Sequence, residues 1–349
     1  MTMGTTIGWD LGGANLKLAR LESGRVTLVA QIPCPVIPDR SKFNCALSEA
    51  LNLCPRGEAA SHAVTMTGEL SDVFATREEG VAYLVTAMQN AIGTERLSIY
   101  AGSAGFLAPD LAVIRPLDVA SANWHASAVL AATYCPDGLL VDFGTTTTDL
   151  VPLRAGAPAS RGVTDGERLA EGELVYTGVV RTPVMAVARE APFKGRAQGI
   201  AAERFATMAD VYRLTGELPN DADPHPSADH RGKSIEESAA RLARMLGRDA
   251  NEAEPTVWID VARHFACLQL AGIEAAARHL IGREQLEAGA PIVGAGCGRF
   301  LAKRLAAQLD IPYRDFAEMI NCAPEAREMA ARCAPAAAVA ILRAKSAAV

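Results

Sequence analysis

Apolar and polar residues alternate along the first part of the chain with the two-residue period of a half-buried strand. The run TIGWD leads into Gly12 and Gly13, NLKLARL carries leucines at 16, 18 and 21, and VTLVAQI follows a turn at Gly24. Successive side chains of a strand point to opposite faces of its sheet, so each run can bury one face. The pattern predicts a three-stranded meander with a tight first corner.

Further along the chain, apolar residues recur at helical spacing. Helices are expected at residues 41–55, 77–93, 121–135, 199–214, 235–247, 257–281 and 323–344, the last with a break near Pro335. Ser121 or Asn123 is the expected cap of the third of these helices. Apolar runs at 62–69, 97–105 and 173–183 predict strands, and residues 290–309 predict a strand, a glycine-rich turn and a helix.

A second strand–turn–strand pattern repeats the first one 132 residues later. The first corner (residues 10–17) has Asp, one residue, Gly and a small polar turn between apolar runs, and the second corner (residues 142–149, DFGTTTTD) has the same order. The repeat predicts a remote internal duplication. Two unrelated hairpins with glycine corners are the alternative.

Composition and charge narrow the class of protein. Half of the 349 residues are apolar and 5% are aromatic, which suits an α/β protein. The net charge of −6 argues against nucleic acid as a partner. Eight cysteines form no CxxC pair, the first ten residues lack the pattern of a signal peptide, and no run reaches about 18 apolar residues. We therefore expect a reduced cytoplasmic protein with no membrane partner.

Both corners carry groups that suit a phosphate-bearing ligand. Glycines let backbone N–H groups approach phosphate oxygens, hydroxyls add donors, and carboxylates at strand ends can hold Mg²⁺ through water. Asp10 and Asp142 are thus the candidate metal ligands. The candidate phosphate-binding residues here are Gly12, Gly13, Asn15, Lys17, Gly144, Thr145, Thr146 and Thr147. Ordinary strand and turn roles are the alternative.

A third glycine corner, IVGAGCGRF, places Gly294 and Gly296 before a predicted helix, whose N-terminus favours anions. The dinucleotide motif G-x-G-x-x-G is absent, because Arg299 stands at its last position. Both glycines are candidates for phosphate binding. Close packing between the strand and the helix is the alternative.

Two residues are candidates for a general base. Glu69 follows a predicted strand, where α/β sheets present ligands, and His125 stands at a predicted helix start. Capping or solvated roles are the alternatives for both.

Three cations complete the candidate site. Arg231 and Lys233 lie in the polar loop DADPHPSADHRGKS and could clamp a diphosphate, and Arg181 lies in an otherwise apolar run, where it needs an anionic partner. A solvated loop and a structural salt bridge are the alternatives.

These motifs resemble a known family. The two Asp–Gly corners and the late glycine corner are similar to the two phosphate motifs and the adenosine motif of the actin-like ATPase superfamily. The stretches GWDLGGANLKLA, GSAGF, SANWHAS, GERLAEGELVYTGVVRTPV, FATMADVYRLTGEL, SADHRGKS and VGAGCGRFLA resemble the hydantoinase A/oxoprolinase-related family linked to tetrahydromethanopterin-dependent one-carbon transfer. The archaeal pattern has glycine where this chain has His230, so Arg231 and Lys233 are preferred to His230 there.

The resemblance implies an α/β fold of two ribonuclease H-like domains with mixed sheets, residues 1–136 and 137–349, the second with a helical insertion at about 199–256. It also implies a transferase of methanofuran or methylofuran biosynthesis. An (aminomethyl)furanylmethyl diphosphate joins the phenol of a glutamylated tyramine or tyrosine, and pyrophosphate leaves. His125, Glu69, Arg181 and Lys233 are the expected catalytic residues, with Mg²⁺ as cofactor. ATP is a possible ligand but is not required for this reaction, and a homodimer is a possible assembly.

Two other functions compete with this interpretation. An ATP-dependent kinase or a hydantoinase/oxoprolinase-like hydrolase would use the adenosine-type motif as ancestral members do. A non-catalytic, nucleotide-switched assembly protein is the third hypothesis, and the lack of paired cysteines weakens its iron–sulfur variant.

Overall fold

The computed structural model describes residues 4–34, 39, 41–54 and 60–347. The chain divides into two compact units. Unit 1 combines Met1–Gly138, Leu153–Arg168 and Arg314–Val349, and unit 2 combines Leu139–Pro152 and Leu169–Tyr313. The first segment ends close to the predicted boundary at 136/137, whereas the last segment, expected in the second domain, belongs to unit 1.

The predicted meander forms one edge of a mixed sheet in unit 1. The strand order is β3-β2-β1-β4-β5-β6, with β1 antiparallel to β2 and parallel to β4. The strands are β1 (Thr6–Leu11), β2 (Asn15–Glu22), β3 (Arg25–Pro33), β4 (Ser61–Met66), β5 (Leu97–Tyr100) and β6 (Phe106–Leu107). Apolar side chains of β1, including Trp9, are fully buried, because helices cover both faces of the sheet.

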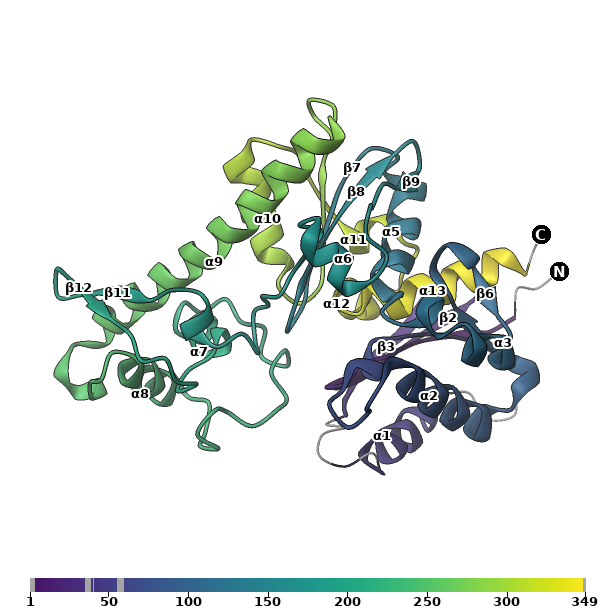
Figure 1. Ribbon diagram of the computed structural model, residues 1–349, viewed down its shortest axis with the longest axis horizontal. Coiled ribbons are helices and arrows are strands. Elements are labelled where there is room, and N and C mark those ends of the chain that lie inside the picture. The colour runs from purple at the N-terminus through teal and green to yellow at the C-terminus, as the bar shows by residue number, and fades with distance from the viewer. Residues whose placement is uncertain (1–3, 35–38, 40, 55–59, 348–349) are drawn as a thin grey trace. The chain divides into compact units, whose positions relative to one another are not determined.

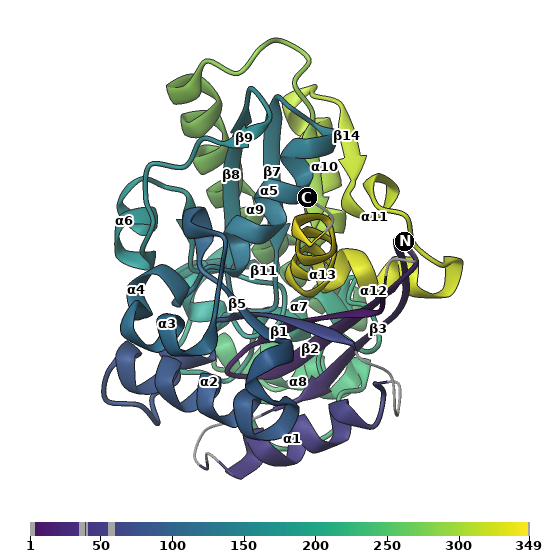
Figure 2. The same cartoon turned by 90° about the vertical axis from the view of Figure 1, so that its right-hand side faces the viewer.

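The helices of unit 1 come from both ends of the chain. Figure 1 shows α13 along one face of this sheet and α1 and α2 on the other. A Cβ atom on Gly8 would overlap the backbone of α13 at Ala336, so this glycine permits the close approach of helix and strand. The helices are α1 (Ser41–Leu51), α2 (Arg77–Ile92), α3 (Pro109–Ile114), α4 (Pro116–Val119), α5 (Asn123–Tyr134), α11 (Phe316–Met319), α12 (Arg327–Arg332) and α13 (Ala334–Ser346). In Figure 2, α5 lies beside α13.

The second mixed sheet repeats the order of the first one. Its strands run β10-β8-β7-β13-β14, with β9 paired to β8 and β13 parallel to β7. A hairpin followed by a parallel strand thus occurs in both sheets. The strands are β7 (Gly138–Phe143), β8 (Thr148–Arg154), β9 (Ala157–Pro158), β10 (Leu174–Val175), β13 (Ile292–Ala295) and β14 (Tyr313–Asp315).

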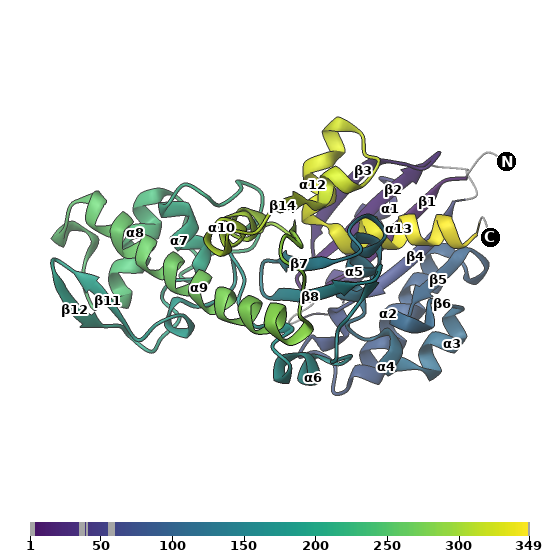
Figure 3. The same cartoon turned by 90° about the horizontal axis from the view of Figure 1, so that it is seen from above.

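Three helices of unit 2, α7, α8 and α10, pack against the long helix α9, which Figure 3 shows lengthwise. The short hairpin β11–β12 packs at one end of α9, where the rings of Phe193 and Trp258 lie 5.3 Å apart. These elements are α7 (Met208–Leu214), α8 (Ile235–Met245), α9 (Pro255–Glu284), α10 (Arg299–Leu309), β11 (Glu190–Phe193) and β12 (Arg196–Gly199). The remaining helix α6 (Asp165–Ala170) begins in unit 1 and ends in unit 2.

Three local expectations were wrong. The helix expected at 199–214 begins only at Met208, because the side chains of Thr207 and Asp210 form a capping box there. The strand expected at 173–183 is limited to β10, since the residues after it bond to a turn instead of a neighbouring strand. Helix α5 begins after Ala122 without a side-chain cap, so neither Ser121 nor Asn123 has the predicted role.

Other expectations were confirmed. The meander and the separation of α12 from α13 next to Pro335 agree with the sequence. None of the eight cysteines takes part in a disulfide in the structure. Within the residues that the structure describes, no helix is long and apolar enough to cross a membrane.

Candidate active site

The same type of backbone hydrogen bond occurs at equivalent positions in both corners. Gly12 N donates to Asn15 O at 3.1 Å, and Gly144 N donates to Thr147 O at 2.9 Å. Each bond closes the turn between the two strands of a hairpin. Together with the matching strand orders, this repeated turn confirms the duplication.

The first corner holds a buried ion pair. Lys17 Nζ lies 3.0 Å from Asp10 Oδ2, and the Asp10 side chain is only 1% exposed. The other oxygen, Asp10 Oδ1, is buried and has no hydrogen-bond partner among the described residues. Burying a carboxylate oxygen without a hydrogen-bond donor costs free energy. Asp10 Oδ1 is therefore suited to contact a ligand.

Residues that follow β4 complete the first corner. A Cβ atom on Gly13 would overlap Ser71 Oγ, and one on Gly12 would lie 3.7 Å from Thr67 Oγ1. Gly13 is therefore explained by close packing against the short 3-10 helix η1 (Gly68–Leu70) and Ser71. The hydroxyls that the second corner carries in its own turn are here supplied by another segment.

Glu69 lies in η1, directly after a residue that packs on the first corner, and is 1% exposed. Its Oε1 accepts from Ser121 N at 2.8 Å and from Ser121 Oγ at 3.2 Å. Its Oε2 is buried without a hydrogen-bond partner in the described part of the chain. Burial raises the pKa of Glu69 to about 7, against which the bonds from Ser121 act. A carboxyl with this pKa can exchange a proton near neutral pH.

His125 is positioned at the start of α5 in the same unit. A hydrogen bond of 2.8 Å joins its Nδ1 to Tyr100 Oη, and the ring lies edge-on to Trp124. Burial lowers the pKa of His125 to about 4, helped by the charge of Arg168. The imidazole is therefore neutral at pH 7, but it is a weaker base than Glu69.

A tightly packed segment covers the second corner in unit 2. Val180 N and Arg181 N donate to Thr145 O at 3.1 and 2.8 Å, and a Cβ atom on Gly178 would overlap the backbone of Thr145. Arg181 is exposed rather than buried in a strand, so it needs no buried anion. Its backbone nevertheless places it beside the threonine turn.

Helix α9 anchors that segment through Gln269, which is 4% exposed. Gln269 Nε2 donates to Thr177 Oγ1 at 2.6 Å and to Gly178 O at 3.0 Å, and its Oε1 accepts from Tyr212 Oη at 2.5 Å. Thr148 Oγ1 also donates to Thr177 O at 2.7 Å. The fourth threonine of the run is thus structural, while Thr145, Thr146 and Thr147 remain half-buried in the turn.

The two candidate glycines of the third corner have different structural roles. A Cβ atom on Gly294 would lie 2.5 Å from Tyr313 Oη, so this glycine makes room for a ring of the neighbouring strand β14, whereas the packing alternative expected contact with the following helix. Gly296 has φ +82°, and a Cβ atom there would lie 2.5 Å from Asp142 Oδ1. Gly296 and Asp142 therefore belong to one corner, whereas Gly294 lies within β13.

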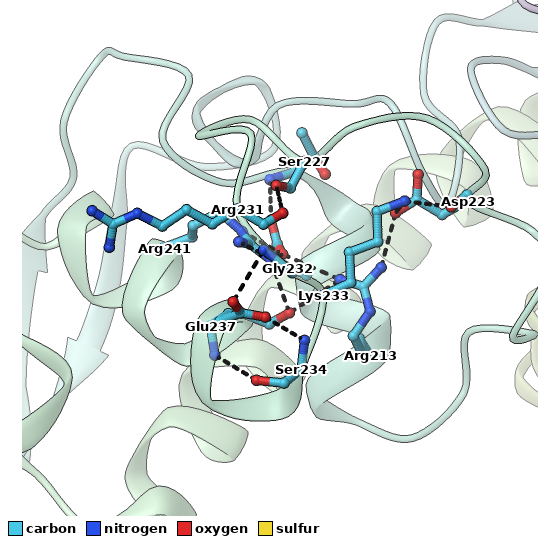
Figure 4. A network of polar contacts seen from close by, with 12 residues as sticks. Arg213, Asp223, Ser227, Arg231, Gly232, Lys233, Ser234, Glu237 and Arg241 are labelled. Atoms are coloured by element: carbon cyan, nitrogen blue, oxygen red, sulfur yellow. Dashed lines mark hydrogen bonds and ion pairs between the residues drawn. The ribbon is translucent and has the colours of Figure 1, made fainter.

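The predicted clamp residues lie in a separate ionic network of unit 2 (Figure 4). Lys233 Nζ lies 3.2 Å from Asp223 Oδ2 and donates to Asp223 O at 2.5 Å. Buried Arg241 contacts Asp229 at 3.0 Å, and Arg231 N donates to the same carboxylate at 3.2 Å. These bonds hold the loop against α8, and the Arg231 side chain is exposed.

His230 has φ +57°, in the left-handed region that favours glycine. The glycine of the archaeal pattern at this position is therefore explained by the backbone, and a metal role for His230 gains no support.

Three residues of these sites lay outside the sequence-based candidates: Ser121, Gly178 and Gln269. Ser121 was considered only as a cap, although its φ of +53° marks an unusual backbone. Gly178 lies in GERLAEGELVYTGVVRTPV, one of the stretches that carry the family resemblance, but only the fold shows that it packs against Thr145.

The side chains near the candidate metal ligands can be compared with the ligand sets that metals usually have. No group of three His, Cys, Asp or Glu side chains that could enclose a metal occurs among the described residues. Mg²⁺ commonly binds one or two carboxylates and completes its shell with water and phosphate. The unpartnered Asp10 Oδ1 fits this kind of ligand set, and Mg²⁺ remains a prediction.

The two sheets of like order and the repeated corner define an actin-like ATPase fold of duplicated ribonuclease H-like domains. The nucleotide-free structure of an acetone carboxylase has this fold too, with a TM-score of 0.56 and 8% identity over 87% of this chain and 67% of that chain. At this identity the match shows the fold alone.

The chain belongs to the hydantoinase/oxoprolinase family, whose model matches residues 61–344. A Methanocaldococcus jannaschii protein named (4-{4-[2-(gamma-L-glutamylamino)ethyl]phenoxymethyl}furan-2-yl)methanamine synthase is 29% identical over 257 residues, 73% of this chain and 76% of that protein. A Methanococcus vannielii protein of the same name is 31% identical over 124 residues, 36% of this chain and 55% of that protein. Both relatives are named as synthases, which supports an enzymatic function for this chain.

Proposed function

We propose that this protein is a transferase of methanofuran or methylofuran biosynthesis that forms an aryl ether. The observation that carries the proposal is the 29% identity to the archaeal synthase over 73% of the chain. The name of that relative describes a phenol joined through oxygen to a furanylmethyl carbon. The proposed substrates are an (aminomethyl)furanylmethyl diphosphate and a glutamylated tyramine or tyrosine.

The reaction forms one carbon–oxygen bond and breaks another. The phenol oxygen attacks the furanylmethyl carbon, the bond from this carbon to the diphosphate breaks with its electron pair on the diphosphate, and the phenol proton moves to a base. The furan ring stabilises positive charge on the reacting carbon, so stabilising the departing diphosphate is the main task of the protein.

The residues of the two corners are the proposed contacts of phosphate oxygens, each with the groups of its own unit. In unit 1, Lys17 supplies an ammonium group next to Asp10. In unit 2, the hydroxyls of the threonine turn and the exposed Arg181 supply donors. The carboxylate of each corner, Asp10 in unit 1 and Asp142 in unit 2, is the proposed Mg²⁺ ligand of its own unit, and Mg²⁺ when bound would neutralise charge on the leaving diphosphate.

Glu69 is the proposed general base. A phenol has a pKa near 10, and a carboxylate whose pKa is about 7 accepts its proton more readily than His125 with a pKa of about 4. Lys233 is engaged with Asp223, so we assign it to the structure of the loop.

The test supplies both substrates with Mg²⁺ and follows the ether and pyrophosphate by mass spectrometry. We expect both products in equal amounts and without ATP. No ether, together with ATP hydrolysis stimulated by the phenol or the furan, would instead support the kinase or hydrolase alternative.

A matched pair of variants tests the role of the second corner. Asp142→Asn should lower kcat by about 100-fold, as loss of one group that stabilises a transition state does. Asp260→Asn makes the same change at an exposed position of α9 and should leave kcat unchanged. Full activity in Asp142→Asn would remove this residue from the proposed machinery.

A further inference from the structure

Ser121 connects two carboxyl groups within unit 1. Its hydroxyl lies 3.2 Å from Glu69 Oε1 and 3.4 Å from Asp165 Oδ2, and its backbone N–H also holds Glu69. The residue is 3% exposed and has φ +53°, a conformation that non-glycine residues rarely adopt. Such strain persists where the surrounding contacts require it.

The chain of hydrogen bonds leads from the interior towards solvent. Glu69 is fully buried, whereas the Asp165 side chain is 18% exposed and lies 3.9 Å from Arg77 Nη2 of α2. On the other side, Gly80 of α2 packs directly on Glu69, and a Cβ atom there would lie 2.6 Å from Glu69 Cα. Asp165 is thus the charged group that acts on Glu69 from this side, and Arg77 lies beside Asp165.

We propose that Ser121 and Asp165 form a proton relay that connects buried Glu69 with solvent. The inference rests on the proposed function, in which Glu69 must lose a proton after every turnover. The unpartnered Glu69 Oε2 takes the phenol proton as the ether forms. The carboxyl group then turns about its last bond and gives that proton to Ser121 Oγ, which passes its own proton to Asp165 Oδ2, and Asp165 releases it to water.

Ser121 and Asp165 are positioning residues for this transfer, because they act through Glu69. Ser121→Gly removes the hydroxyl while glycine keeps the positive φ without strain. Ser23→Gly is the matched control, since Ser23 is exposed with φ +49° in the turn between β2 and β3. Asp165→Asn removes the carboxylate that accepts the proton from Ser121.

The first measurement does not depend on catalysis. The carbonyl infrared band of protonated Glu69, identified by its loss in Glu69→Gln, is followed after a rapid pH jump across pH 7. We expect Glu69 to lose its proton about tenfold more slowly in Ser121→Gly and Asp165→Asn than in the wild type or Ser23→Gly. A change of this size is modest for the loss of a group that transfers protons. Equal rates in all proteins would overturn the relay.

The second measurement compares the first turnover with later ones. In Ser121→Gly the first ether forms at the wild-type rate, because Glu69 still accepts one proton, whereas the steady-state rate falls by about tenfold. A first turnover slowed as much as the later ones would also contradict the relay. If the wild type forms no ether, the proposed function fails, and the pH-jump result still decides for or against the relay.

Discussion

At the scale of single residues, the buried carboxyl of Glu69 is the group whose chemistry the fold changes most. The same side chain in water would be ionised at pH 7, whereas burial brings its pKa to about 7. Asp10 is equally buried but has the ammonium group of Lys17 at 3.0 Å. Asp10 has a cation beside it, whereas Glu69 is held by the hydroxyl and the backbone N–H of Ser121, and this difference separates the chemical roles of the two carboxyl groups.

Glu69→Gln tests this difference through stability. The folded protein disfavours ionised Glu69, so the wild type loses stability as pH rises from about 4.5 to about 7, and the variant has no such loss. We expect the free energy of unfolding of the variant, relative to the wild type, to increase by about 3 kcal/mol between pH 5 and pH 8. Urea denaturation at both pH values measures it.

Glu95→Gln is the matched control, because Glu95 is exposed in the same unit. Its effect should be the same at both pH values. A Glu69→Gln effect that does not change with pH would show that the carboxyl is not kept from ionising by its surroundings.

At the scale of elements, each corner takes its shape from a segment distant in sequence. Residues 67–71 pack on the first corner, and residues 177–182 pack on the second one. The second segment is bound to α9 through Gln269 and contains the glycine that fits over Thr145. Both turns are therefore packed and hydrogen-bonded without ligand, and a site formed in advance lowers the cost of binding an anion.

Gly178→Ala tests the fit of the covering segment. The added Cβ atom overlaps the backbone of Thr145 and Thr146, which cannot move as a flexible side chain can. We expect a loss of about 1–3 kcal/mol in the free energy of unfolding and weaker pyrophosphate binding by calorimetry.

Gly272→Ala provides the comparison, because no atom lies within 4 Å of a Cβ atom built there. This helical position should gain up to about 1 kcal/mol. Equal stability of the Gly178→Ala protein and the wild type would mean that the segment does not pack on the corner as described.

At the scale of the whole molecule, two buried neutral histidines lie in unit 1. Burial lowers the pKa values of His62 and His125 to about 4, and His62 accepts a hydrogen bond from Trp9. The unfolded chain binds these protons below about pH 6.5, so the stability they contribute is present above that pH and is lost as pH falls towards 4. Lowering the pH should therefore reduce the stability of unit 1 more than that of unit 2.

Tryptophan fluorescence can follow this loss in unit 1 alone. The chain has three tryptophans, and Trp258→Phe removes the one in unit 2. In a Glu69→Gln background, which removes the opposing titration, we expect the urea midpoint of Trp9 and Trp124 fluorescence to fall between pH 7 and pH 4.5. A midpoint independent of pH would contradict neutral burial of both histidines.

Local pattern by itself determined much of this protein. The period-two runs predicted the first meander, and the two Asp–Gly corners 132 residues apart predicted the duplication, because alternation and glycine turns depend on neighbouring residues. The long helix α9 and the polar loop before α8 were predicted for the same reason. The hydantoinase A resemblance came from short motifs and agrees with the family match.

Only the tertiary structure decided which distant residues meet. No periodicity indicates that Gly178 covers Thr145, that Ser121 joins Glu69 to Asp165, or that the last helix packs on the first sheet. The pKa of a carboxyl depends on burial and on partners more than fifty residues away, as in the bond from Ser121 to Glu69. Sequence therefore supplied the chemical groups, and folding determined which of them are buried and which lie within reach of one another.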